Sequence, residues 1–155
     1  MRDSLSQSIR RALKGVGPFS KPVADAVLEV AYLTMAVDEE LRDEELEAFA
    51  LIAGELVGGG EAPDSRQMAK RLDGLGQALD KSTILERLEK TAATFGDDKT
   101  AKLAAYRVAT LMANIDLDAA DREFEFDLDL IATLGLAQEE ADTIADEVNT
   151  AITPE

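Results

Sequence analysis

VAYLTMAVDEELRDEELEAFALIAGEL, residues 30–56, decides the fold of this chain. An almost wholly apolar segment is followed by an acidic elbow and then by an amphipathic segment. The same plan recurs over residues 108–134, VATLMANIDLDAADREFEFDLDLIATL. Apolar and acidic positions coincide at one constant offset, which aligns Val30 with Val108, Leu33 with Leu111, Asp38 with Asp116, Asp43 with Asp121, Glu45 with Glu123 and Leu56 with Leu134. Because internal repeats usually mark units of supersecondary structure, two related helical pairs are predicted.

Helical spacing of apolar residues continues outside the two repeats and predicts one all-α domain of about seven to eight helices. One run, from Phe124 to Leu130, alternates with period two and would by itself predict a strand. Its position in the second repeat favours a helix instead. The predicted organisation is a basic N-terminal arm (1–22) and a domain (23–155), the latter containing repeat one (23–57), a middle helical hairpin (63–96), repeat two (97–136) and a C-terminal helix (137–152).

Only Asp25, Glu29 and Thr34 are polar between residues 23 and 37, so this helix is predicted to be surrounded by others. Glu29 aligns with Arg107 in the repeat, and the two would form an ion pair if the central helices pack around a pseudo-twofold axis. Two glycines in the following hairpin, Gly74 and Gly76, weaken a helical pattern. Close packing of helices at these positions would explain them.

The composition excludes several kinds of chemistry. The chain has no cysteine and no histidine, so disulfides, thiolate or histidine zinc sites and Ser-His-Asp catalysis are excluded. The absence of cysteine fits a reducing cytoplasm, where we expect the protein. No apolar run is long enough for a transmembrane segment, and no apolar stretch follows the basic N-terminal residues as in a signal peptide.

The net charge of −16 argues against nucleic acid as a partner. That charge is uneven: residues 1–22 carry +4, 23–62 carry −10, 63–107 carry +2 and 108–155 carry −12. Such polarity indicates either neutralisation within the fold or complementarity to a partner. The basic N-terminal helix allows two interpretations, attraction to an anionic membrane surface or docking of its Leu5, Ile9 and Leu13 face on the core. We favour docking.

The acidic elbows are the candidate site. Carboxylates alone suit Ca²⁺, Mg²⁺ or Mn²⁺, and a pseudo-twofold axis could bring both elbows together. The primary candidate ligands are Asp38, Glu45, Asp116 and Glu123, with Glu40, Asp43, Asp118 and Asp121 as secondary candidates. The alternative is that these side chains cap helices and interact favourably with the positive N-terminal ends of helix dipoles. We favour capping over a cation site.

The apolar helix that ends in Asp38 or Asp116, with a glutamate seven residues later and then an amphipathic helix, resembles the TerB-like family of tellurite-resistance proteins. The closing residues 134–140, LGLAQEE, are similar to the end of that family. The resemblance covers about residues 23–150. One departure is that the family commonly has Asp-Gly at the elbow, where this chain has Glu39 and Leu117.

The resemblance implies an all-α cytoplasmic domain with two repeats, associated with bacterial stress and tellurite resistance, whose relatives act near a membrane partner. We therefore expect a non-enzymatic module that binds a protein partner, a membrane-associated one included. A divalent cation at the elbows is the additional candidate ligand. Two alternatives stay open. One is a metal-dependent hydrolase that uses the same carboxylates, and the other is a purely structural homodimeric scaffold.

Overall fold

Helices account for nearly all of the described chain. The computed structural model describes residues 2–13, 16, 19–36, 43–56, 65–115 and 128–152, and within these ranges it contains no strand. The helices are α1 (Arg2–Ala12), α2 (Lys21–Ala36), α3 (Asp43–Leu56), α4 (Ser65–Asp80), α5 (Ile84–Phe95), α6 (Lys99–Ile115) and α8 (Gln138–Ile152). Residues 128–134 are helical as well. The predicted all-α class is confirmed.

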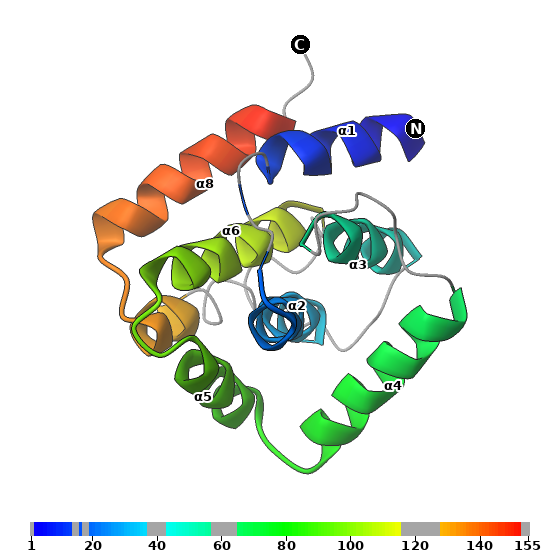
Figure 1. Cartoon of the computed structure of the whole chain (residues 1–155). Coiled ribbons are helices and arrows are strands. Elements are labelled where there is room, and N and C mark those ends of the chain that lie inside the picture. Colours follow the sequence, from blue (N-terminus) through cyan, green and yellow to red (C-terminus); the bar gives the residue numbers. More distant parts are fainter. Residues whose placement is uncertain are drawn as a thin grey trace.

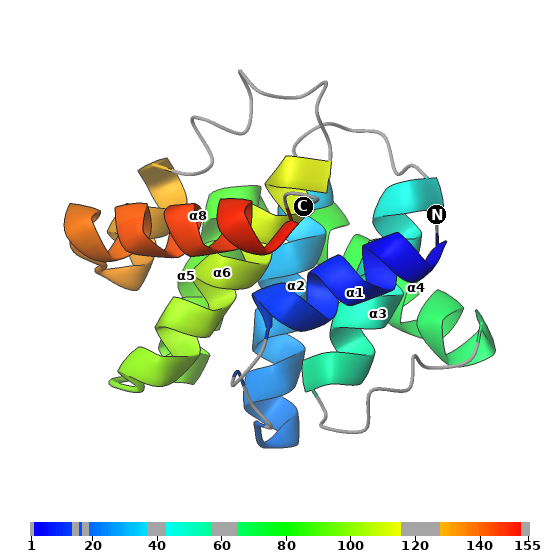
Figure 2. The same ribbon diagram turned by 90° about the horizontal axis from the view of Figure 1, so that it is seen from above.

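The central helix is α2, which Figure 1 views nearly end-on with α3, α5 and α6 around it. Figure 2 shows the same helix passing through the middle of the molecule. From residue 24 to residue 35 every side chain except that of Asp25 is buried. A helix that is apolar on all sides needs cover on all sides. The prediction that other helices surround this segment is therefore confirmed.

α1 docks on the core through one apolar face. Ile9 and Leu13 are only 1% and 3% exposed, and α1 lies beside α8 at one edge of the molecule (Figures 1 and 2). The guanidinium of Arg11 donates from Nε to the carbonyl oxygen of Ala151 at 2.7 Å, near the end of α8. A cation at this end of a helix is favourable because the free carbonyls are there. Docking of the predicted face on the core is confirmed for Ile9 and Leu13, whereas the side chain of Leu5 lies outside the described residues.

The ends of α5 show how the local sequence sets the helix boundaries. Thr83 accepts a hydrogen bond from the backbone N–H of Glu86 at 3.1 Å, and Glu86 accepts one from the N–H of Thr83 at 3.0 Å. This reciprocal pair is a capping box. At the other end Gly96 has φ of 58°, a left-handed conformation that side chains disfavour. Both boundaries of α5 are thus set by residues at or next to the helix ends.

α4 lies at the outside of the molecule and contacts the core with one stripe, which consists of Met68, Leu72, Leu75 and Leu79. Its two glycines differ. A Cβ added at Gly76 would lie 3.3 Å from Tyr32 Oη, whereas one added at Gly74 would meet nothing within 4 Å. Close packing thus explains Gly76, as predicted, but the same explanation is wrong for Gly74.

None of the helices in the described part of the chain combines the length and apolarity that a membrane crossing requires.

Candidate functional site

The acidic elbows predicted to bind a cation lie largely outside the described residues. This is true of Asp38, Glu40, Asp116, Asp118, Asp121 and Glu123. Asp43 and Glu45 fall in the first turn of α3, where the structure describes the backbone alone. Among the residues whose side chains are described, no three carboxylates gather closely enough to hold a metal ion. The cation site therefore stays a prediction.

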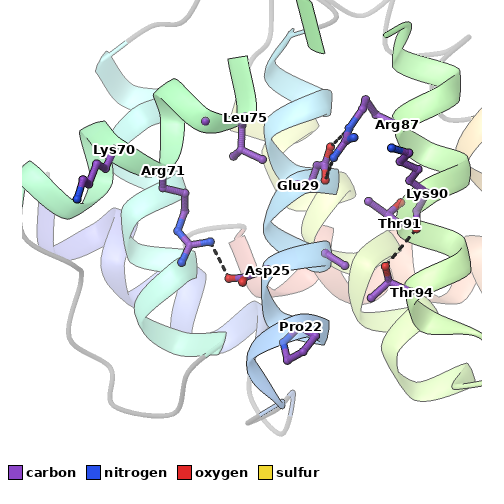
Figure 3. Close-up of a pocket in the computed structure, with 12 residues that line it drawn as sticks. Pro22, Asp25, Glu29, Lys70, Arg71, Leu75, Arg87, Lys90, Thr91 and Thr94 are labelled. Carbon is purple, nitrogen blue, oxygen red and sulfur yellow. Dashed lines mark hydrogen bonds and ion pairs between the residues drawn. The ribbon is translucent and has the colours of Figure 1, made fainter. Parts of the chain in front are cut away.

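A groove between α2, α4 and α5 is rich in charged side chains (Figure 3). Its volume is about 490 Å³. Six charged side chains line it: Asp25, Glu29, Lys70, Arg71, Arg87 and Lys90. The remaining lining residues are small, apolar or hydroxylic: Pro22, Ala26, Gly74, Leu75, Thr91 and Thr94. The groove thus has four cations against two carboxylates.

The two carboxylates of the groove lie one turn apart on α2 and hold the flanking helices through ion pairs. Glu29 accepts hydrogen bonds from Arg87 of α5, at 2.5 Å from Nε and 2.8 Å from Nη2. Asp25 accepts one from Nη1 of Arg71 on α4 at 2.7 Å. Because planar guanidinium and carboxylate groups match each other, the Arg87 contact is fixed in orientation as well as distance.

The two pairs differ in their exposure to water. The side chains of Glu29 and Arg87 are 11% and 17% exposed, whereas those of Asp25 and Arg71 are 39% and 32% exposed. Hydrogen bonding to the Glu29 carboxylate raises the pKa of the Arg87 guanidinium above its ordinary value, although burial acts in the opposite direction. The inner pair is therefore a structural anchor, and the outer pair is accessible to a ligand.

The expected Glu29–Arg107 pair is wrong. The central helices α2 and α6 do pack against each other, but Arg107 donates to Glu147 of α8 at 2.6 Å and to the carbonyl oxygen of Ala12 at 3.3 Å. Glu29 faces α5 on a different side of α2. Glu29 and Arg107 share a position in the repeat but are not in contact, because each side chain pairs with the helix that covers its own face, α5 for Glu29 and α8 for Arg107.

Two lysines bring positive charge to the groove without an ion pair among the described residues. Lys90 extends from α5 toward α2, and Lys70 lies on α4 beyond Arg71 as seen from α2 (Figure 3). Both side chains are exposed. The hydroxyls of Thr91 and Thr94 donate to backbone carbonyls of their own helix, at 2.7 and 3.2 Å. Their oxygens can still accept a hydrogen bond from a ligand.

The groove continues into a second hollow of about 530 Å³, which is lined by Lys21, Asp25, Gln67, Lys70 and Arg71. Three of these residues, Asp25, Lys70 and Arg71, line the first hollow too. Lys21 lies 3.7 Å from Asp25 and its side chain is 82% exposed. The two hollows form one elongated trough along α2 and α4.

A third hollow, of about 380 Å³, lies between α6 and α8. Its charges are mostly paired: Arg107 binds Glu147, and Lys99 Nζ lies 2.8 Å from Glu140 Oε1. The Lys99 ammonium, with the backbone N–H of Ala137, lowers the pKa of the Glu140 carboxyl below its ordinary value. These contacts join the starts of α6 and α8, so we assign them a role in stability.

Among its described lining residues, the groove offers charged groups that can bind an anion. The chain has no cysteine or histidine, the two threonine hydroxyls of the groove are bonded to backbone carbonyls, and both carboxylates face arginines. None of these groups forms the paired nucleophile and base that covalent catalysis requires. The arginines and the exposed lysines around this groove, by contrast, can hold an anionic group.

This groove was not predicted, although the sequence contains two signals for it. Asp25 and Glu29, spaced by one turn, are carboxylates in an otherwise apolar helix, and such groups need partners when buried. The middle of the chain, like residues 1–22, also carries basic residues without an excess of acid. What the sequence could not supply is the pairing, since it depends on which faces of α2 are covered by α4 and α5.

Comparison with known proteins gives no match: no protein-family model, no curated protein and no solved structure is similar to this chain.

Proposed function

We propose that the chain is a non-enzymatic module that binds a protein partner through the groove between α2, α4 and α5. The observation that carries the proposal is the open trough in which Lys70 and Lys90 are exposed and have no ion pair within the described residues. Small-molecule sites are usually enclosed and mostly apolar. An open, charged trough is better suited to a segment of another protein.

A TerB-like stress-response role is the biological setting we propose for this module. Two features support it: the acidic elbows of the sequence, and the starts of α2 at Lys21 and α6 at Lys99, which keep the offset of the sequence repeat. In this proposal the elbows bind a divalent cation as a second ligand, through Asp38, Glu45, Asp116 and Glu123. The proposed module then has two ligands, a protein partner and a divalent cation.

Site-specific photo-cross-linking tests the partner proposal. A photoreactive residue is placed at position 70 or 90 in the groove and, as a matched control, at the exposed position of Asp146 on α8. After irradiation of the cells that make the protein, adducts are identified by mass spectrometry. We expect the same protein to be trapped from positions 70 and 90 and not from position 146. Identical adducts from all three positions, or none, would contradict the proposal.

Calorimetric titration tests the cation separately. Chelator-stripped protein is titrated with Ca²⁺, Mg²⁺ and Mn²⁺, and the titration is repeated on the Asp38→Asn/Asp116→Asn variant. Saturable binding that the variant lacks is the expected result, because each substitution removes a negative oxygen ligand. Binding that is absent, or equal in both proteins, assigns the elbow carboxylates to helix capping.

A further inference from the structure

The trough between α2, α4 and α5 is cationic in a strongly acidic protein. Four basic side chains, Lys70, Arg71, Arg87 and Lys90, line the first hollow together with two carboxylates, and Lys21 adds a fifth cation at the second. The whole chain carries −16. A polyanion is therefore repelled by the molecule as a whole, so any binding of an acidic ligand has to come from this local concentration of cations.

Gly74 is a second and independent observation. A helix interior disfavours glycine, since glycine loses more backbone freedom than other residues on folding. At Gly76 the close approach of Tyr32 accounts for the missing side chain, but a Cβ at Gly74 would meet nothing within 4 Å. Gly74 lines the groove between Arg71 and Leu75. The missing side chain leaves the groove open beside Arg71 and Leu75.

The shape of the trough points to an extended ligand. Its two hollows share Asp25, Lys70 and Arg71 and together run along α2 and α4. Lys90 on α5 and Lys21 at the start of α2 lie in different hollows. A ligand that carries several anionic groups along its length could meet both ends, whereas a single small anion would meet one.

The lining residues favour a peptide over a nucleic acid. Neither hollow has an aromatic side chain among its lining residues, and single-stranded nucleic acids are usually held by stacking of bases on aromatic rings. Carboxylates of a peptide can instead pair with lysine ammonium groups, and they can compete with Asp25 for the half-exposed Arg71.

We propose that this trough binds an acidic peptide segment of the partner, rich in glutamate or aspartate, with Lys70, Lys90 and Arg71 as its ion-pair partners and Gly74 as the residue that leaves room for it. The assignment rests on the proposed function and specifies the chemistry of the partner. Arg87 stays on Glu29 and holds α5 in place.

Fluorescence anisotropy with a labelled peptide of alternating glutamate and serine tests this assignment, with the glutamine–serine peptide as the neutral control. We expect saturable binding of the acidic peptide alone, weakened by salt. The Lys70→Glu/Lys90→Glu variant should lower the affinity about tenfold or more. The charge-matched Lys81→Glu/Lys102→Glu variant, whose positions line neither hollow, should retain most of it.

Gly74→Leu separates shape from charge. It leaves every charge in place and puts a good helix former into α4, so the protein should fold with at least its original stability and lose peptide binding. Undiminished binding in this variant, or equal losses in the two charge variants, would overturn the proposal. Tighter binding of a single-stranded oligonucleotide than of the peptide would overturn it too. If the acidic peptide does not bind but photo-cross-linking from positions 70 and 90 traps a partner, the acidic chemistry is wrong and the proposed function stands. If the peptide does not bind and cross-linking traps no partner, both proposals are overturned.

Discussion

Glu29 shows how one residue can fix the arrangement of two helices. It lies in the buried stretch of α2, where a charged carboxylate is costly unless a partner neutralises it. Arg87 of α5 supplies two hydrogen bonds to it. Because the Glu29 carboxylate or the Arg87 guanidinium alone would be a buried unpaired charge, the pair holds α5 on one side of α2.

Arg87→Met should therefore be more damaging than Arg71→Met. The first substitution leaves Glu29, which is 9% exposed as a residue, without its ion-pair partner. We expect a loss of about 3 kcal/mol in the free energy of unfolding. The second leaves Asp25 with 39% of its side chain exposed, and should cost under about 1 kcal/mol. Urea denaturation of the two variants measures both losses. Equal losses would show that the Glu29 pair is not an anchor.

Gly74 and Gly76 offer a second comparison within one helix. Both Gly→Ala substitutions gain helix propensity, up to about 1 kcal/mol. At position 76, however, the new methyl group would lie 3.3 Å from Tyr32 Oη, and the ring would have to move. We expect Gly74→Ala to raise the midpoint of urea denaturation more than Gly76→Ala does. The reverse order would mean that space in front of Gly74 is not open in solution.

At the scale of elements, helix ends are where the local sequence is most informative. Thr83 and Glu86 form a capping box, Gly96 takes the left-handed conformation after α5, and Asp98 accepts a hydrogen bond from the N–H of Ala101 at 3.1 Å. These features depend on residues within a few positions of one another, so the sequence predicts them well. Contacts between elements depend on distant residues and are less predictable.

Thr83→Ala should destabilise the protein by about 1 kcal/mol, because the N–H of Glu86 loses its acceptor at the start of α5. Thr94→Ala is the matched control. Its hydroxyl donates to the carbonyl oxygen of Lys90 within the same helix, the one hydrogen bond it makes among the described residues, so its removal should cost little. Thermal unfolding followed by circular dichroism compares the two, and similar losses would argue against the cap.

Glu140 connects the starts of α6 and α8 and should make stability depend on pH. Since Lys99 and the N–H of Ala137 lower its pKa in the folded protein, its contribution is present above the ordinary value of 4.5 and is lost as the pH falls through the folded pKa. The stability difference between wild type and Glu140→Gln should thus shrink toward low pH. Glu139→Gln, which removes no ion pair found among the described residues, should show no such trend, and a constant difference for Glu140→Gln would refute the linkage.

At the scale of the molecule, the sequence predicted the all-α class and the surrounded central helix, and for Ile9 and Leu13 it predicted the docking of the N-terminal helix. The reason is that apolar periodicity reports directly on which faces are buried. The same pattern could not predict that Glu29 meets Arg87 rather than Arg107, because repeat alignment carries no information on which helix covers which face. It also could not reveal the trough, which three helices form together.

Partner binding in a cationic trough of a strongly acidic protein is the central proposal. Its most direct test is an NMR titration of isotope-labelled protein with the glutamate–serine peptide, with backbone amide shifts followed residue by residue. We predict that the largest shifts fall on α2, α4 and α5 around Asp25, Gly74 and Lys90, and that α1 and α8 stay unchanged. Shifts centred on α1 or α8, or no shifts at saturating peptide, would contradict the claim.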